Sequence, residues 1–296
     1  MRTVYLGTSD FAVTILRRLA ESPHAPELVV TRPDRPRGRG RKLTPPPVAE
    51  AARELGLELY QPDSVNSEEA VARIGAIRPD AMCLCAFGAL IKEPLLSDHM
   101  IFNVHPSLLP RWRGAAPVER AIMSGDAATG VTIIRLTAGL DSGPICAQEA
   151  EPISGQDTYG TLAPRLAELG GRLLIDSLSG EVRWTEQDEA LVTYAEKIEA
   201  ADRRLDPVRR SADELERVVR ALDPHIGAFV LLDDEVRLGV HRAGVADGGS
   251  LAAGAWSLDG DVPVLGCASG ALELLVVQPP GRRAMSGEDY LRGLHR

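Results

Sequence analysis

Short apolar runs alternate with amphipathic helical patterns over the first 180 residues, and this alternation restricts the fold more than any other feature of the chain. Apolar runs at 3–6, 28–31, 57–60, 81–86, 100–105 and 131–136 have the length and composition of buried strands. Strands that alternate with helices pair in a mostly parallel sheet with helices on both faces. We therefore predict an α/β domain with a Rossmann-like sheet over residues 1–183.

The pattern changes after residue 183. Residues 184–205 are polar and dense in charge, which is typical of a linker between domains. A helical pattern at 212–222 follows, and short strand-like runs then lie at 226–232, 235–242, 255–258, 262–267 and 272–278. Because Gly and Asp separate these runs, we predict a small OB-like β-barrel domain over residues 206–296.

Composition excludes several classes of protein. The hydrophobic content is 44% and the charged content is 25%, which is ordinary for a globular protein. No apolar run approaches the roughly 18 residues that a membrane helix needs. The N-terminal residues lead directly into the first predicted strand without a signal-peptide pattern, so we expect a cytoplasmic protein with no membrane association.

Metal and nucleotide cofactors are not expected. Cys83 and Cys85 lie in an apolar strand-like run without further ligands at metal-site spacing, so they are interpreted as small buried residues. The turn that begins at Gly7 lacks the second and third glycines of a dinucleotide-binding loop. We therefore predict neither a metal site nor a nicotinamide site.

Three polar side chains form the candidate catalytic set. Asn103 and His105 are two residues apart on a predicted strand that Pro106 ends, so both side chains face the same space. Alone, this pair could have the structural role of forming hydrogen bonds with backbone groups at the end of a strand. With Asp141, which lies in a glycine-flanked loop, the set has what acyl transfer to an amine requires. Asn103 suits an oxyanion, His105 suits proton transfer or a second oxyanion contact, and Asp141 suits orienting the imidazole or taking up a proton through water.

A basic segment lies between the second predicted strand and the next helix. Its cations alternate with Gly and Pro, and they are Arg35, Arg37, Arg39, Arg41 and Lys42. Such a run could be a solvated surface, but it is also suited to contact phosphates. The net charge of −9 does not oppose the second interpretation, since nucleic-acid binding depends on local patches.

The residues at 103–117 and 139–144 resemble the signature of the 10-formyltetrahydrofolate-dependent formyltransferases. The likeness rests on the Asn-x-His strand, on the Ser-Leu-Leu-Pro run at 107–110 and on Asp141. The turn at 7–12, the basic segment at 33–43, and the stretches at 192–198 and 274–285 resemble the members that act on methionyl-tRNA. Ser9 stands where those members commonly have proline.

The resemblance implies that the chain transfers the formyl group of 10-formyltetrahydrofolate to the α-amino group of methionine on initiator Met-tRNA, for translation initiation. Asn103, His105 and Asp141 would be the catalytic residues, and the protein would act without a metal and as a monomer. The implied folate-binding residues are Ser107, Leu108, Leu109, Pro110, Phe87, Gly88 and Leu90. The implied tRNA-binding residues are Arg35, Arg37, Arg39, Arg41, Lys42 and Lys197.

Two alternatives stay open at this point. A formyltransferase for nucleotide-sugar amines would share the catalytic residues but would not need the basic segment. A tRNA- or folate-binding module that has lost catalysis would bind without turnover.

Overall fold

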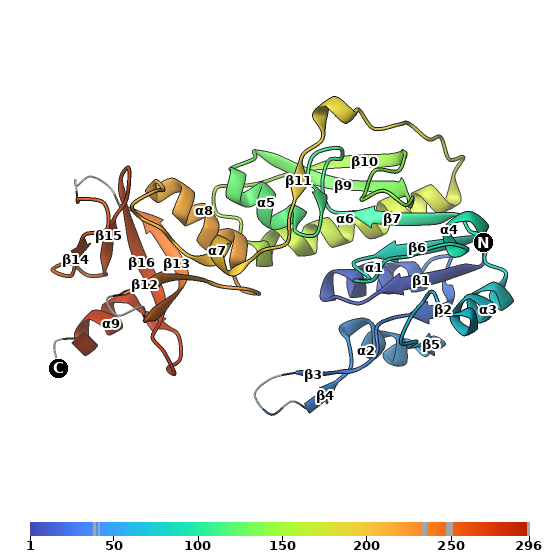
Figure 1. Ribbon diagram of the computed structural model, residues 1–296, viewed down its shortest axis with the longest axis horizontal. Coiled ribbons are helices and arrows are strands. Elements are labelled where there is room, and N and C mark those ends of the chain that lie inside the picture. Colours follow the sequence, from blue (N-terminus) through green and yellow to red (C-terminus); the bar gives the residue numbers. More distant parts are fainter. Residues whose placement is uncertain (38–39, 41, 233–235, 247–250, 295–296) are drawn as a thin grey trace. The chain divides into compact units, whose positions relative to one another are not determined.

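The computed structural model describes residues 1–37, 40, 42–232, 236–246 and 251–294 (Figure 1). Contacts divide the chain into two compact units, each assembled from separate stretches of sequence. The first unit contains Met1–Gly114, Thr129–Glu151 and Ala163–Tyr194. The second unit contains Ala115–Ala128, Pro152–Leu162 and Ala195–Arg296.

A seven-stranded sheet forms the centre of the first unit, in the order β10-β9-β7-β6-β1-β2-β5. Its strands are β1 (Thr3–Gly7), β2 (Pro26–Val30), β5 (Leu59–Tyr60), β6 (Ala81–Cys85), β7 (Ile101–His105), β9 (Ala128–Arg135) and β10 (Ile145–Pro152). The pairs from β5 through β7 are parallel, and β9 runs antiparallel to β7. The prediction of a mostly parallel α/β sheet is confirmed.

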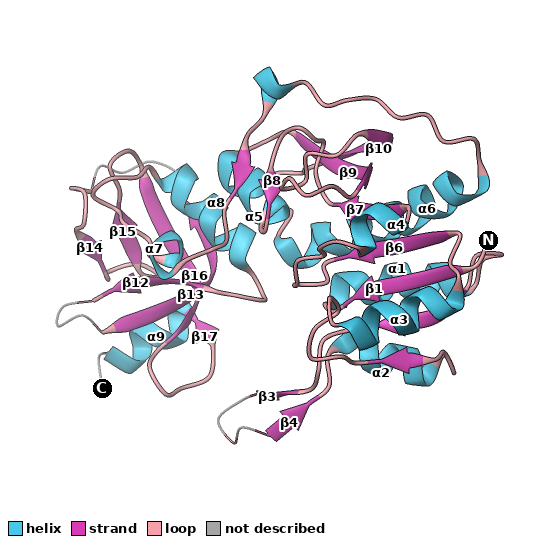
Figure 2. Ribbon diagram, turned by 45° about the vertical axis from the view of Figure 1, so that its right-hand side comes forward, coloured by secondary structure: helices cyan, strands magenta, loops and turns pink. Residues whose placement is uncertain are grey.

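Helices α1 (Asp10–Ala20), α2 (Pro47–Glu54), α3 (Glu68–Ile77), α4 (Leu95–Asp98) and α6 (Tyr159–Ser179) accompany this sheet (Figure 2). In α1, the apolar positions at helical spacing are the buried ones, because one face of the helix covers the sheet. Ser67 begins α3 by accepting a hydrogen bond from the Ala70 N–H. A Cβ at Gly170 of α6 would lie 2.8 Å from Val104 Cγ1, so this glycine allows α6 to pack closely against β7.

Two polar segments of the first unit have more structure than the sequence pattern indicates. The described ends of the basic segment form a hairpin, in which β3 (Arg35–Arg37) pairs antiparallel with β4 (Lys42–Thr44). Residues 184–194, predicted as the first half of a linker, pack against the first unit, and we call them the strap. The Trp184 ring lies 5.7 Å from the Phe102 ring, and Thr185 forms a β-bridge with Ile145. The strap continues through a 3-10 turn at Glu189–Leu191 to β11 (Tyr194–Ala195), which pairs with β8 (Arg113–Gly114).

The second unit contains an antiparallel β-sheet, whose strands lie within residues 206–296, where the sequence predicts a small OB-like β-barrel. Its strands are β12 (Ala228–Leu231), β13 (Arg237–Val245), β14 (Trp256–Ser257), β15 (Val264–Gly266), β16 (Ala271–Gln278) and β17 (Met285–Ser286). The helices are α5 (Pro117–Ser124), α7 (Ala200–Arg203), α8 (Ala212–Leu222) and α9 (Gly287–Leu294). Ser211 and Glu214 form a capping box at the start of α8, and the apolar face of α8 completes the core over the sheet.

Candidate active site

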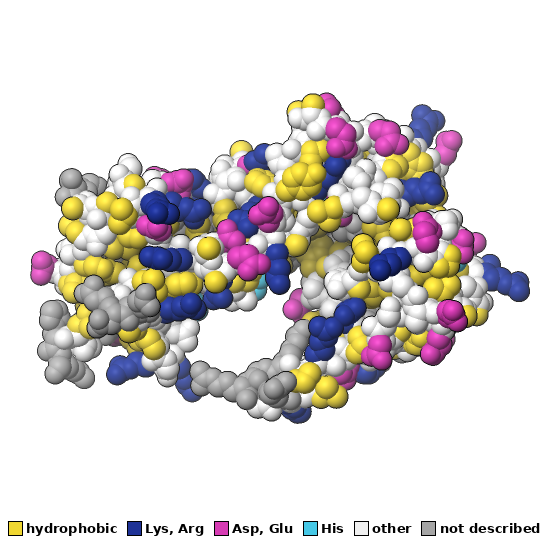
Figure 3. Space-filling view, in the orientation of Figure 1, with side chains coloured by type: hydrophobic (Ala, Val, Ile, Leu, Met, Phe, Trp, Pro, Cys, Tyr) yellow, Lys and Arg dark blue, Asp and Glu magenta, His cyan; other side chains and the backbone are white. Residues whose placement is uncertain are grey.

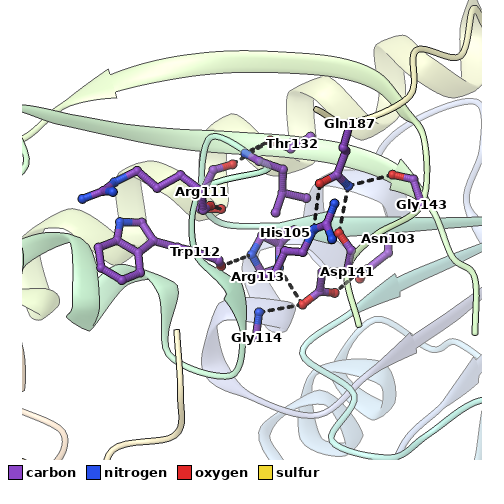
Figure 4. Close-up of polar contacts among 12 residues, drawn as sticks. Asn103, His105, Arg111, Trp112, Arg113, Gly114, Thr132, Asp141, Gly143 and Gln187 are labelled. Atoms are coloured by element: carbon purple, nitrogen blue, oxygen red, sulfur yellow. Dashed lines mark hydrogen bonds and ion pairs between the residues drawn. The ribbon is translucent and has the colours of Figure 1, made fainter. Parts of the chain in front are cut away.

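Asn103, His105 and Asp141 lie together in the first unit (Figure 4). Asn103 and His105 project from the same face of β7, and both are nearly fully buried. Asn103 Nδ2 donates to Asp141 Oδ1 at 3.3 Å, and His105 Nδ1 lies 3.5 Å from Asp141 Oδ2. The Gly114 N–H donates to the same Oδ2 at 2.9 Å. One carboxylate thus faces an amide donor, an imidazole and a backbone donor.

The His105 ring lies between two hydrogen-bond acceptors. Its Nε2 is 2.8 Å from the carbonyl oxygen of Trp112, which can only accept, so Nε2 carries a hydrogen. Its Nδ1 faces the Asp141 carboxylate. Because Nε2 is engaged by Trp112, Nδ1 is the ring nitrogen that faces the space shared with Asn103 and Asp141.

The loop at 136–144 brings Asp141 to this position. It begins beside the start of β7, where the Leu136 N–H donates to the Ile101 carbonyl, and it ends where the Arg135 N–H donates to the Pro144 carbonyl. Between these points the chain runs along β7 until Asp141 faces His105. Asp141 itself has a φ of 45°, which lies in the left-handed region. This region is unfavourable in free energy for any residue that has a side chain.

Three side chains around Asp141 were not predicted from the sequence. Gln187 of the strap donates from Nε2 to the carbonyl oxygens of Asp141 and Gly143, both at 2.8 Å. Its Oε1 accepts a hydrogen bond from Arg113 Nε at 3.0 Å. Arg113 is buried and also pairs with the exposed carboxylate of Glu189 at 2.8 Å, and the hydrogen bond from Arg113 lowers the pKa of Glu189. A polar segment without periodicity gives no sequence signal for such contacts.

Sequence families that match this chain cover both predicted domains. A formyl transferase model matches residues 1–178, and a formyl transferase C-terminal domain model matches residues 197–295. The chain belongs to the formyltransferase family. The resemblance in the sequence is thereby confirmed.

Relatives of similar length fall in the same family. The chain is 44% identical to the methionyl-tRNA formyltransferase of Methylococcus capsulatus, over 98% of this chain and 96% of the relative. It is 40% identical to that of Gluconobacter oxydans, over 99% of this chain and 97% of the relative. An N-formyltransferase from Helicobacter canadensis, solved with folinic acid and dTDP-3-aminofucose, has the same fold, with a TM-score of 0.67 at 13% identity over 93% of this chain and 98% of that one.

The formyltransferase Ser-Leu-Leu-Pro run follows β7 and is held by buried hydrogen bonds. Thr132 Oγ1 donates to the Ser107 carbonyl at 2.6 Å and accepts from the Leu109 N–H at 3.1 Å. Gln148 donates to the Leu109 carbonyl and to Thr132 Oγ1, both at 2.8 Å. Ser107 and Leu109 are buried, whereas Leu108 and Pro110 are partly exposed. The run therefore has a fixed backbone with two side chains open to contact.

The other residues implied for folate lie directly after β6. Phe87 is buried in the apolar cluster of the first unit, and its carbonyl accepts a hydrogen bond from Thr8 at 2.7 Å. Gly88 has a φ of 73°, which glycine adopts without strain, and Leu90 is 66% exposed. Of this group, Leu90 is the apolar side chain open to contact, while the Phe87 side chain supports the core.

The cations implied for tRNA lie in both units. Arg35 and Lys42 are exposed on the β3–β4 hairpin, and Lys197 is exposed in the second unit. Arg39 and Arg41 lie outside the described residues, and of Arg37 only the backbone is described. On the face shown in Figure 3, Lys and Arg side chains are interspersed with Asp and Glu side chains.

The cysteines are free thiols, as expected. Cys83 and Cys85 are buried in β6, and burial raises the pKa of Cys83 to about 12. Among the residues that the structure describes, no group of three or more His, Cys, Asp or Glu side chains could hold a metal ion. Within the same ranges, no helix has both the length and the apolar character to cross a bilayer.

Proposed function

We propose that this formyltransferase transfers the formyl group of 10-formyltetrahydrofolate to the α-amino group of methionine on initiator Met-tRNA, for translation initiation. The observation that carries the proposal is the identity of 39–44% to methionyl-tRNA formyltransferases over nearly the whole chain. The likeness includes the basic segment, which a formyltransferase for nucleotide-sugar amines would not need.

In the proposed reaction, the methionine nitrogen attacks the formyl carbon, and the formyl oxygen gains negative charge. Asn103 Nδ2 and protonated His105 Nδ1 are the side-chain donors available to that oxygen, because His105 Nε2 is held by Trp112. The attacking amine loses one proton, and the departing folate nitrogen gains one, so the reaction needs no net acid or base. Asp141 faces His105 and is placed to assist that proton transfer.

The remaining binding roles are those that the family resemblance implies. We propose that Leu108, Pro110 and Leu90 contact the folate, with Ser107, Leu109, Phe87 and Gly88 fixing the backbone around them. Arg35, Arg37, Arg39, Arg41, Lys42 and Lys197 are proposed to contact tRNA phosphates. We further propose that the protein acts as a monomer in the cytoplasm.

The test compares formyl transfer to charged initiator tRNA by the wild type, Asp141→Asn and Asp98→Asn. In Asp141→Asn, one carboxylate oxygen becomes an amide nitrogen that must face either Asn103 Nδ2 or the Gly114 N–H, both of which are donors. Asn103 could accept only by turning its own donor away. The turnover should therefore fall on the order of 100-fold or more. Asp98 is exposed on α4, so its variant should retain activity after the same change of charge.

Backbone strain does not contribute to the difference between the wild type and Asp141→Asn, because asparagine tolerates the left-handed conformation of residue 141 at least as well as aspartate. Full activity of Asp141→Asn would refute the assigned site. If the wild type formylates an amino-sugar nucleotide and not Met-tRNA, the fold stands and the proposed substrate is wrong. Binding of both substrates without any transfer would instead favour a module that has lost catalysis.

A further inference from the structure

Gln187 contacts the loop that carries Asp141 through the main chain rather than through the carboxylate. Both hydrogens of its amide are used, one on the Asp141 carbonyl and one on the Gly143 carbonyl. The first carbonyl belongs to the peptide unit between Asp141 and Ser142, and the second to the unit between Gly143 and Pro144. The contacts therefore fix the direction in which the Asp141 side chain leaves the loop.

Arg113 fixes the orientation of the Gln187 amide. An arginine can only donate and a carbonyl oxygen can only accept, so the amide oxygen must face Arg113 and the amide nitrogen must face the loop. Arg113 and Gln187 are 3% and 9% exposed, so water competes weakly for these hydrogen bonds. The residue after Arg113 is Gly114, whose N–H binds the Asp141 carboxylate. Asp141 is thus held through its main chain by Gln187 and through its side chain by Gly114.

Such support matters because Asp141 has a left-handed backbone. A residue with a side chain remains in that region only when its surroundings hold it there. Glycines at 139 and 143 give the loop freedom to adopt other conformations, and the Gln187 hydrogen bonds oppose that freedom.

We propose that Gln187 is a positioning residue for formyl transfer, which holds Asp141 against His105 and Asn103 without contacting the substrates. The proposal rests on the proposed function. It gives the strap a role in catalysis, although the sequence pattern of the strap predicts only a connection between domains.

The test combines Gln187→Met and Gln187→Glu with Asp141→Asn. Methionine keeps the length of the side chain and removes all three hydrogen bonds. Glutamate keeps the acceptor for Arg113 but replaces the donors to the two carbonyls with a second acceptor. Both variants should lower kcat by about 10- to 100-fold with little change in KM for either substrate, because only the geometry of Asp141 changes. If Gln187 served only as a partner for Arg113, the glutamate variant would retain activity, and this result would overturn the proposal.

The double variant distinguishes positioning from general damage. If Gln187 acts through the Asp141 carboxylate, Gln187→Met should cost little further kcat once Asp141→Asn is present. If the fold-losses of kcat in the two single variants multiply in the double variant, Gln187 acts independently of the Asp141 carboxylate, and this result would overturn the proposal. Gln61→Met is the matched control for kcat, because Gln61 Nε2 also donates to two oxygens while its Oε1 accepts from an arginine. Since one of those oxygens belongs to Asp34 in the basic segment, KM for Met-tRNA is not used in this comparison. Its kcat should equal that of the wild type.

The two proposals can fail separately. A wild type that transfers no formyl group to Met-tRNA would refute the proposed function. A wild type that does so, together with a fully active Gln187→Met variant, would refute the positioning role alone.

Discussion

Gly143→Ala should displace Asp141 without changing any polar side chain. A Cβ built on Gly143 would lie 1.8 Å from the Arg135 carbonyl oxygen and 3.1 Å from Thr137 Cγ2. The first of these contacts is to backbone and cannot be relieved by a rotamer change. Arg135 ends β9, which the sheet holds in place, so the loop at 136–144 must move instead.

The size of the effect follows from that displacement. Restoring an ordinary contact of 3.4 Å from 1.8 Å requires a shift of more than 1 Å. A misplacement of even about 1 Å costs on the order of 100-fold in rate. The shift also weakens the hydrogen bonds from the Arg135 N–H to the Pro144 carbonyl and from Gln187 to the Gly143 carbonyl. Overpacking of this kind lowers the free energy of unfolding by about 1–3 kcal/mol.

The assay measures kcat for formyl transfer at 25 °C, well below the unfolding transition, with thermal unfolding followed in parallel. Gly75→Ala is the control, because a Cβ at this exposed position in α3 would have no atom within 4 Å. A Gly143→Ala enzyme with kcat within about threefold of the wild type would show that the geometry of the loop does not control catalysis, and the reasoning would be refuted.

Four further outcomes are expected. Asn103→Ala should lower kcat by about 100-fold or more, as measured by initial rates, through loss of one oxyanion donor. Lys42→Ala should reduce the salt dependence of reaction with Met-tRNA by about one unit of slope, and an unchanged slope would count against phosphate contact. Gly75→Ala should raise the free energy of unfolding by about 0.5–1 kcal/mol in denaturant titrations. Burial raises the pKa of the Cys83 thiol to about 12, so the contribution of the protonated thiol to the free energy of unfolding is complete below the ordinary thiol pKa and is lost as the pH rises toward 12. For the same reason, the thiol of the native protein should resist alkylation near pH 8.

The strands of the first unit could be predicted because burial on both faces makes a parallel strand a continuous apolar run. β6 and β7 show this directly, since every residue of each is buried. β10 was missed because it has partly exposed and exposed residues along its whole length, so it shows neither an apolar run nor a regular alternation. The sequence gives no strand signal for the β3–β4 hairpin, because Arg35, Pro36, Lys42 and Leu43 are exposed and form no apolar pattern.

The candidate site also contains residues that could be predicted from the sequence and residues that could not. Asn103 and His105 could be placed together because a strand has a period of two, which is a local rule. The approach of Asp141 depends on a loop that folds back toward β7. Asp141 could be named as a site residue because the sequence resembles the family. Gln187 could not be found, because its role depends on contacts across 44 and 74 residues of sequence and not on any periodicity.

The path of the strap affects how this enzyme can be divided into parts. A fragment that ends at residue 183 contains Asn103, His105 and Asp141, yet it lacks the side chain that fixes the Asp141 main chain and the Thr193 groups that bind Trp112 and Arg113. A chimera that exchanges the second domain at that point would import a foreign strap into the active site. A fragment that keeps these hydrogen bonds therefore has to extend through Thr193.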